Sequence, residues 1–202
     1  MMMKKIMLIV CCLAYGLTVS AQDSTGARSQ VKVDVGTLLG TNTRSAGQAY
    51  SSSANNLFHI GVGYTFNFDN RFQATIGPRF DYYSKLLFND EDAMLAAIFL
   101  QGQFNFSETP KTLFSYANYG MGPKMGGGFY AGSIIELGLG WQYQPQFLGK
   151  KTMSFSVGYN RTNLKDVYAE RHTSTNGVNV TTTTGYYRLG LKSVALNIGL
   201  SF

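Results

Sequence analysis

The sequence predicts an all-β fold, an eight-stranded antiparallel up-and-down transmembrane β-barrel preceded by a cleaved signal peptide. Three observations support this prediction. The chain opens with a basic start and an apolar stretch, apolar and polar residues then alternate in eight segments, and the polar face of those segments carries mostly small side chains.

The first 21 residues are typical of a secretory signal peptide. Lys4 and Lys5 precede an apolar stretch, and Val19-Ser20-Ala21 offers small residues for cleavage before Gln22. A transmembrane anchor is the alternative, but it needs about 20 apolar residues without a cleavage site. We therefore expect residues 1–21 to be removed as a signal peptide.

The expected mature part is a single barrel domain, residues 22–202. It has 202 − 21 = 181 residues and no cysteine, because Cys11 and Cys12 lie in the signal peptide, so disulfides, thiolate metal sites and thiol catalysis are excluded. Its 17 − 2 = 15 basic and 11 acidic residues give a net charge of +4, spread along the chain. A charge so diffuse excludes a nucleic-acid partner, and no apolar run of about 18 residues follows that would form a transmembrane helix.

Strict alternation of apolar and polar residues predicts the strands. The clearest alternation covers residues 58–68, and a short turn at Asp69-Asn70 follows it. In residues 113–121 the pattern leaves open which face is apolar. The eight predicted segments are 31–35, 58–68, 72–82, 94–106, 113–121, 135–143, 153–159 and 194–202.

A soluble β-sandwich would also alternate, so the chemistry of the two faces decides. The polar face here is mostly Gly, Ser, Asn, Gln and Thr, which suits a narrow enclosed lumen better than a water-facing sheet. Strands of about 9–11 residues fit eight times into the mature chain, whereas sixteen would leave almost no connections, which excludes a large porin. Aromatic residues near the strand ends predict girdles at two membrane interfaces: Phe68, Phe72, Phe106, Trp141, Tyr143 and Phe202 at one, and Phe80, Tyr82 and Tyr159 at the other.

The last two strands are expected to form a long hairpin. Asn176-Gly177 is a favoured type I′ turn, which pairs Thr175 with Val178. Extending this register pairs Met153 with Leu200 and matches every outward apolar residue with another, a match that a one-residue slip would destroy. Arms of about 24 residues are roughly 80 Å long at about 3.3 Å per residue, so the hairpin is expected to project far beyond the membrane.

Six charged residues are expected to face the lumen. Arg79 and Glu136 lie at similar heights and could meet across it, since buried charges need partners. We interpret the cluster as a structural plug, because eight strands leave an interior just wide enough for side chains, and an ion path or gate is the alternative. The predicted lumen cluster is Lys32, Asp34, Arg71, Arg79, Asp81 and Glu136.

No catalytic, cofactor or metal site is predicted. His59 falls on an inward position and is interpreted as a satisfied lumen histidine. Glu170, His172 and Ser174 lie on one side of an extended strand and are similar in type to the residues of lipid-A deacylase barrels. The predicted register places them near the hairpin apex, far from an acyl ester, so a lipid-A-modifying enzyme is only a distant alternative.

Arg161 and Lys192 are expected to face each other on the outside, at the top of the apolar band. Like charges opposite one another repel, so an anion between them would explain the pair, and a lipopolysaccharide phosphate is the candidate. The alternative is that both side chains extend to water.

The alternating segments, the signal that ends before Gln22 and the terminal Phe202 resemble the small Gram-negative outer-membrane β-barrel proteins of the OmpX and OmpA-barrel type. The resemblance covers essentially the whole mature chain and implies localisation in the cell outer membrane. It also implies longer outer loops at residues 40–56, 84–92 and 161–192. In that family the barrel assembly machinery reads a terminal alternating strand, which would here be Val194, Leu196, Ile198, Leu200 and Phe202.

Two classes of function follow, both in contact with outer-membrane lipid and lipopolysaccharide and neither needing a cofactor. The first is a non-enzymatic surface protein whose hairpin edges and Thr181–Thr184 run bind an extracellular protein. The second is a minor porin or transport-associated channel, which would need an open lumen.

Overall fold

The computed structural model describes residues 29–45, 48–50, 57–83, 93–122, 130–149, 151–175 and 179–202, so the predicted signal peptide lies outside the described residues. No helical segment in these ranges is long or apolar enough to cross a membrane. The elements are β1 (Ser29–Ser45), β2 (Gln48–Tyr50), β3 (Leu57–Asn67), β4 (Phe72–Tyr83), β5 (Ala93–Asn105), β6 (Thr112–Met121), β7 (Tyr130–Tyr143), a 3-10 turn η1 (Gln146–Leu148), β8 (Thr152–Thr175) and β9 (Asn179–Ser201).

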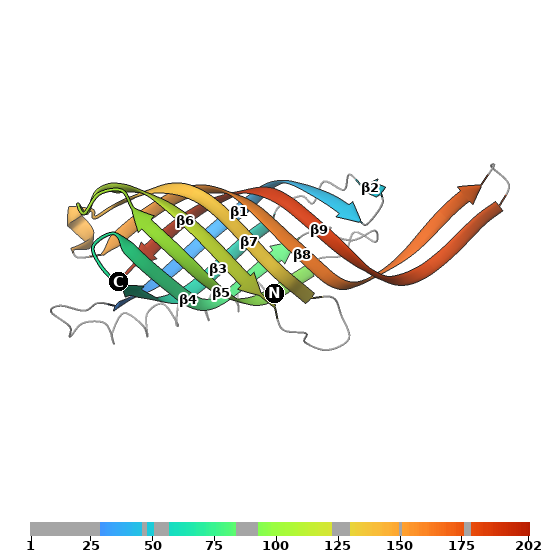
Figure 1. The fold of residues 1–202 in the computed structure, drawn as a ribbon, viewed down its shortest axis with the longest axis horizontal. Coiled ribbons are helices and arrows are strands. Elements are labelled where there is room, and N and C mark those ends of the chain that lie inside the picture. Colours follow the sequence, from blue (N-terminus) through green and yellow to red (C-terminus); the bar gives the residue numbers. More distant parts are fainter. Residues whose placement is uncertain are drawn as a thin grey trace.

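Eight of the strands form a closed antiparallel barrel, which confirms the predicted fold class (Figure 1). Each strand from β3 to β9 pairs with its neighbour in sequence, and β1 pairs with both β3 and β9. Phe202 donates its backbone N–H to Val31 at 2.9 Å and accepts one from Val31 at 3.3 Å, which fastens the two chain ends. Closure leaves no free sheet edge in the barrel wall.

The barrel has two distinct ends. At one, which we call the turn end, short connections join β3 to β4, β5 to β6 and β7 to β8, and the C-terminus lies there. At the other, which we call the hairpin end, β8 and β9 continue together beyond the barrel (Figure 1).

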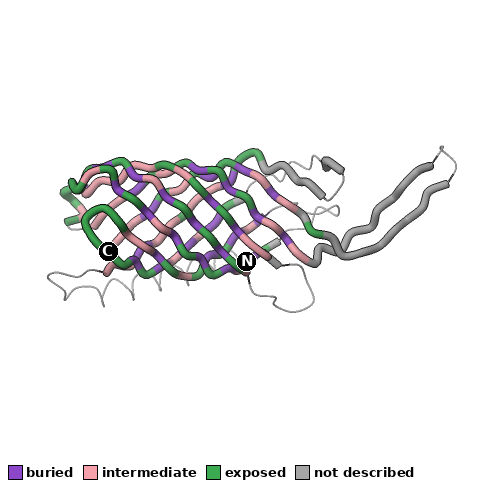
Figure 2. The backbone as a smooth tube through the Cα atoms, in the orientation of Figure 1, coloured by how far each residue is buried: buried purple, intermediate pink, exposed green. Residues whose placement is uncertain are grey.

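Burial alternates along the strands, as Figure 2 shows. In β6 the inward positions are Thr112, Phe114, Tyr116 and Asn118, which fixes the face that the sequence left open. The outward positions form an apolar belt to which all eight barrel strands contribute. Its large exposed members include Val35, Leu39, Phe58, Phe66, Ile76, Phe80, Ile98, Leu100, Leu113, Tyr119, Leu137, Leu139, Val157, Tyr159, Leu196 and Ile198.

Aromatic residues flank this belt at both ends, as predicted. At the turn end the ring centroids of Trp141 and Tyr143 lie 4.8 Å apart, and those of Phe68 and Phe72 lie 5.6 Å apart. At the hairpin end Phe58 and Tyr82 lie 5.9 Å apart. A closed barrel with an apolar belt between two aromatic girdles is a transmembrane barrel of the outer-membrane type.

The predicted hairpin register is confirmed within the barrel and wrong above it. Met153 pairs with Leu200, and the same register runs up to Leu164 opposite Leu189. A bulge follows, after which the pairing is shifted by one residue, so Thr175 lies opposite Asn179 and not Val178. The sequence argument assumed unbroken pairing, whereas an extra residue in one strand shifts everything beyond it. The proposed Asn176-Gly177 turn lies outside the described residues.

Two of the three expected outer loops contain paired strands. In the first, residues 40–56, β1 continues to Ser45 and pairs with β2, and in the third, residues 161–192, β8 and β9 stay paired nearly throughout. The paired strands therefore extend beyond the segments in which apolar and polar residues alternate, and those segments were the basis of the loop boundaries. The second loop, residues 84–92, lies outside the described residues.

Glycine lets the barrel wall accept large inward side chains. A Cβ added to Gly138 would clash with the carbonyl oxygen of Val157 and lie 2.6 Å from Cε1 of Tyr116. Outward-facing Gly102 has more room, since its added Cβ would come no closer than 3.9 Å to Phe72.

We expect Gly138→Val to destabilise the barrel by about 1–3 kcal/mol, because the new side chain overlaps both backbone and a buried ring. The matched variant Gly102→Val should stay within about 0.5 kcal/mol of the wild type. Urea midpoints in detergent, read from the single tryptophan, Trp141, measure both. Equal midpoints for the two variants would contradict the packing described for Gly138.

Candidate functional site

The lumen is the candidate site, and an apolar layer and a charged layer of side chains fill much of it. The layer nearest the hairpin end is apolar, whereas the alternating pattern predicts an inward face of mostly small polar residues. The sequence contains a pattern that could have predicted this apolar layer, because its residues occupy inward positions of their strands. Its members, each at most 4% exposed, are Leu38, Tyr83, Leu95, Ile134, Leu164 and Leu191.

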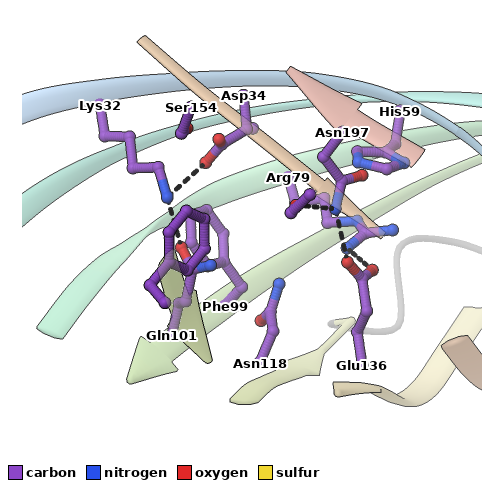
Figure 3. Close-up of a pocket in the computed structure, with 13 residues that line it drawn as sticks. Lys32, Asp34, His59, Arg79, Phe99, Gln101, Asn118, Glu136, Ser154 and Asn197 are labelled. Atoms are coloured by element: carbon purple, nitrogen blue, oxygen red, sulfur yellow. Dashed lines mark hydrogen bonds and ion pairs between the residues drawn. The ribbon is translucent and has the colours of Figure 1, made fainter. Parts of the chain in front are cut away.

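Below the apolar layer lies an ion network centred on Glu136 (Figure 3). Arg79 donates from Nη1 to Glu136 at 3.0 Å and from Nε to Asp81 at 2.7 Å. The Glu136 carboxylate also accepts hydrogen bonds from Tyr116 at 2.8 Å, Asn160 at 3.0 Å and Asn197 at 2.8 Å. Four side-chain donors from four other strands therefore converge on one buried carboxylate.

A second ion pair lies next to this network. Lys32 is 3.6 Å from Asp34 and donates to Gln101 at 3.0 Å. In Figure 3 the amine of Lys32 points toward these two side chains. The described lumen thus holds two cations, Lys32 and Arg79, against three carboxylates.

Arg71 does not belong to the lumen cluster, which corrects the prediction. Its side chain is about half exposed and lies 3.3 Å from Glu108 of the next turn. The inward–outward alternation holds only within strands, and Arg71 precedes the first residue of β4. It is part of a turn in which Asp69 accepts the backbone N–H groups of Arg71 and Phe72, and these hydrogen bonds lower the pKa of Asp69.

Little space remains between the layers. A cavity of about 20 Å³ lies among residues that include Lys32, His59, Phe99, Glu136 and Asn197, and this volume holds about one water molecule. Phe99 and Phe114, from β5 and β6, occupy much of the lumen at this height. The sequence pattern predicts neither ring in the lumen, because apolar and polar residues do not alternate clearly in residues 94–106 and 113–121.

His59 faces inward and is buried, as its position predicted. Its Nδ1 has no hydrogen-bond partner, so the expectation of a fully satisfied histidine is wrong for this atom. Within the described part of the chain, no group of three or more His, Cys, Asp or Glu side chains is arranged to hold a metal ion.

The other predicted residues lie outside the lumen. Arg161 and Lys192 are directly opposite one another across β8 and β9, and the terminal strand from Val194 to Leu200 places its alternate apolar residues outward. The side chains of Glu170, His172 and Ser174, and those of Thr181–Thr184, are not among the described ones, although their backbones pair within the hairpin.

No protein-family model and no curated protein matches this chain. Solved structures with a similar course of the backbone include Neisserial surface protein A, at 15% identity and a TM-score of 0.42, covering 85% of this chain and 96% of that one. The outer membrane protein OprG from Pseudomonas aeruginosa matches at 11% identity and a TM-score of 0.38, covering 87% and 96%. Ail, the attachment invasion locus protein of Yersinia pestis, solved with a heparin analogue, matches at 12% identity and a TM-score of 0.29. The match covers 86% of this chain and 97% of that one.

We expect Arg79→Met to destabilise the barrel by about 3–5 kcal/mol, because Asp81 and Glu136 would remain buried without their cation. Arg71→Met removes an arginine from an exposed ion pair and should cost no more than about 1 kcal/mol. Urea unfolding midpoints compare the two variants. If Arg79→Met were as stable as Arg71→Met, the lumen network would not be a stabilising element.

Proposed function

We propose that this outer-membrane barrel is a non-enzymatic surface protein that uses the β8–β9 hairpin to bind another protein. The observation that carries the proposal is the length of the two strands, 24 and 23 residues, against 10–17 in the other barrel strands. The barrel is the anchor in this proposal and the hairpin is the binding element.

Above the bulge the hairpin is a two-stranded ribbon. Its pairing runs from Val167 opposite Tyr187 to Thr175 opposite Asn179, which is roughly 25–30 Å at about 3.3 Å per residue. Among the described residues, β7 pairs with β8 only up to Lys165 and β1 pairs with β9 only up to Leu189. Neither outer edge of the ribbon is paired with another strand in the described part of the chain, so its backbone N–H and C=O groups offer a site for an added strand.

The channel alternative finds less support in the lumen. A solute would have to displace the six tightly buried side chains of the apolar layer and then cross the Arg79–Glu136 ion pair. The cavity among the charged residues of the lumen holds about one water molecule. We therefore propose that the charged residues act as a structural plug and do not line a conducting path.

The hairpin should be accessible from the cell exterior. Residues 22–202 contain no cysteine, so in the expected mature chain Ser174→Cys introduces a single thiol near the hairpin apex, and Ser107→Cys places one in the β5–β6 turn at the opposite end. We expect a membrane-impermeant maleimide to label only Ser174→Cys on intact cells and both variants after lysis. Labelling of Ser107→Cys alone on intact cells would reverse the orientation and remove the proposed role.

A photo-crosslinking amino acid at Thr183, on the ribbon, should form discrete adducts with a second protein on intact cells, because added strands pair along its edges. The same substitution at Ser107 is the control. No adduct at Thr183, or an equal yield of adducts at Ser107, would contradict binding along the ribbon.

Purified protein in a planar lipid bilayer should give no steady unitary current, since the filled lumen leaves no continuous water path. Reproducible single-channel steps would favour the porin alternative over the plug. Replacing both Leu164 and Leu191 with Ser tests the apolar layer itself, and any current that appears only in this variant would identify that layer as the seal.

A further inference from the structure

The cations with described side chains fall into two groups. Five have a partner: Lys32 and Arg79 in the lumen, Arg71 beside Glu108, and Lys111 and Lys151 over the rings of Trp141 and Phe202 at 5.8 and 4.9 Å. The other four have no ion pair, hydrogen bond or ring contact with any described residue. These four are Arg161, Lys165, Arg188 and Lys192, and all lie on β8 and β9.

Arg161 and Lys192 form the lower of two pairs. They are direct cross-strand partners on the outer face, with Arg161 exposed and Lys192 half-buried. Side chains so placed have Cβ atoms only about 5 Å apart, and like charges at this distance repel. An anion held between them converts this repulsion into attraction.

Lys165 and Arg188 form the upper pair, at the bulge. The register passes from Leu164 opposite Leu189 to Val167 opposite Tyr187, so two residues of β8, beginning with Lys165, lie along the backbone opposite Arg188 alone. The aliphatic part of Lys165 lies over Gly132 of β7, where an added Cβ would come within 2.7–2.8 Å of its Cγ, Cδ and Cε. Because its aliphatic part packs on the barrel wall, the Lys165 side chain stays close to the membrane and does not extend freely into water.

The position of the two pairs above the apolar belt indicates which part of a lipid they contact. Tyr159 and Val194 lie two residues below the lower pair, face each other across the strands, and are nearly half exposed as members of the apolar belt. The lower pair therefore lies where acyl chains give way to headgroups. The upper pair is four residues further along each strand, roughly 13 Å at about 3.3 Å per residue, which is comparable to a two-sugar headgroup.

We propose that the Arg161–Lys192 and Lys165–Arg188 pairs bind the two phosphates of a bisphosphorylated disaccharide lipid, the headgroup of lipopolysaccharide in the outer leaflet. The two pairs supply four positive charges against the two phosphate groups. The apolar belt directly below supplies a surface for the acyl chains. Because this surface adjoins the two charged pairs, the site favours a phosphorylated lipid over a soluble phosphate. The site is independent of the hairpin edges proposed above to bind protein.

Native mass spectrometry of the full-length protein, titrated with purified bisphosphorylated and monophosphorylated lipid A, tests the proposal. Arg161→Gln/Lys192→Gln and Lys165→Gln/Arg188→Gln remove one pair each. The control, Lys111→Gln/Lys151→Gln, removes the same charge at the turn end. The shift of gel mobility on boiling verifies that each variant is folded.

We expect the wild type to bind the bisphosphorylated lipid more tightly than the monophosphorylated one. Each pair variant should lose at least about tenfold in affinity for the bisphosphorylated lipid and much of this discrimination, and the control should match the wild type. Unchanged affinity in both pair variants would overturn the proposal. An equal loss in the control would also overturn it, because net charge alone would then explain binding.

Discussion

Backbone hydrogen bonding is the constraint on which the rest of this structure depends. Lipid offers no partner for an exposed N–H or C=O group, so the sheet must close, and the pairing of β1 with β9 and of Val31 with Phe202 closes it. Closure with eight strands then fixes a lumen about one side chain wide. Each inward residue must therefore find its partner within that lumen, and each outward residue must suit lipid.

The lumen satisfies this constraint by separating apolar from charged side chains. Burying Arg79 is tolerable because Asp81 and Glu136 lie within hydrogen-bond distance, and Glu136 is in turn surrounded by neutral donors. The apolar layer around Leu164 and Leu191 covers this network on the hairpin side. Glycines such as Gly138 make room for the ring of Tyr116. Ion pairing, apolar packing and backbone space thus act together to fill one narrow interior.

The sequence predicted most of the fold, because alternation reports directly on which face meets lipid. The outward residues of β3, β4 and β9 were identified in this way, and so was the approach of Arg79 to Glu136. The apolar layer was missed because its members come from six strands and gather only when the barrel closes. Arg71 was misplaced because alternation has no meaning in a turn, and the bulge after Leu164 was missed because nothing in the local pattern marks an extra residue.

The most direct test of the account is the gel mobility of the protein, extracted from the outer-membrane fraction in mild detergent, with and without boiling. A closed barrel keeps its hydrogen-bonded wall in detergent at room temperature and unfolds on heating, so we predict a clear shift on boiling and recovery from that fraction. A protein that shows no shift and is recovered in the soluble periplasmic fraction would contradict the transmembrane barrel and restore the soluble β-sandwich.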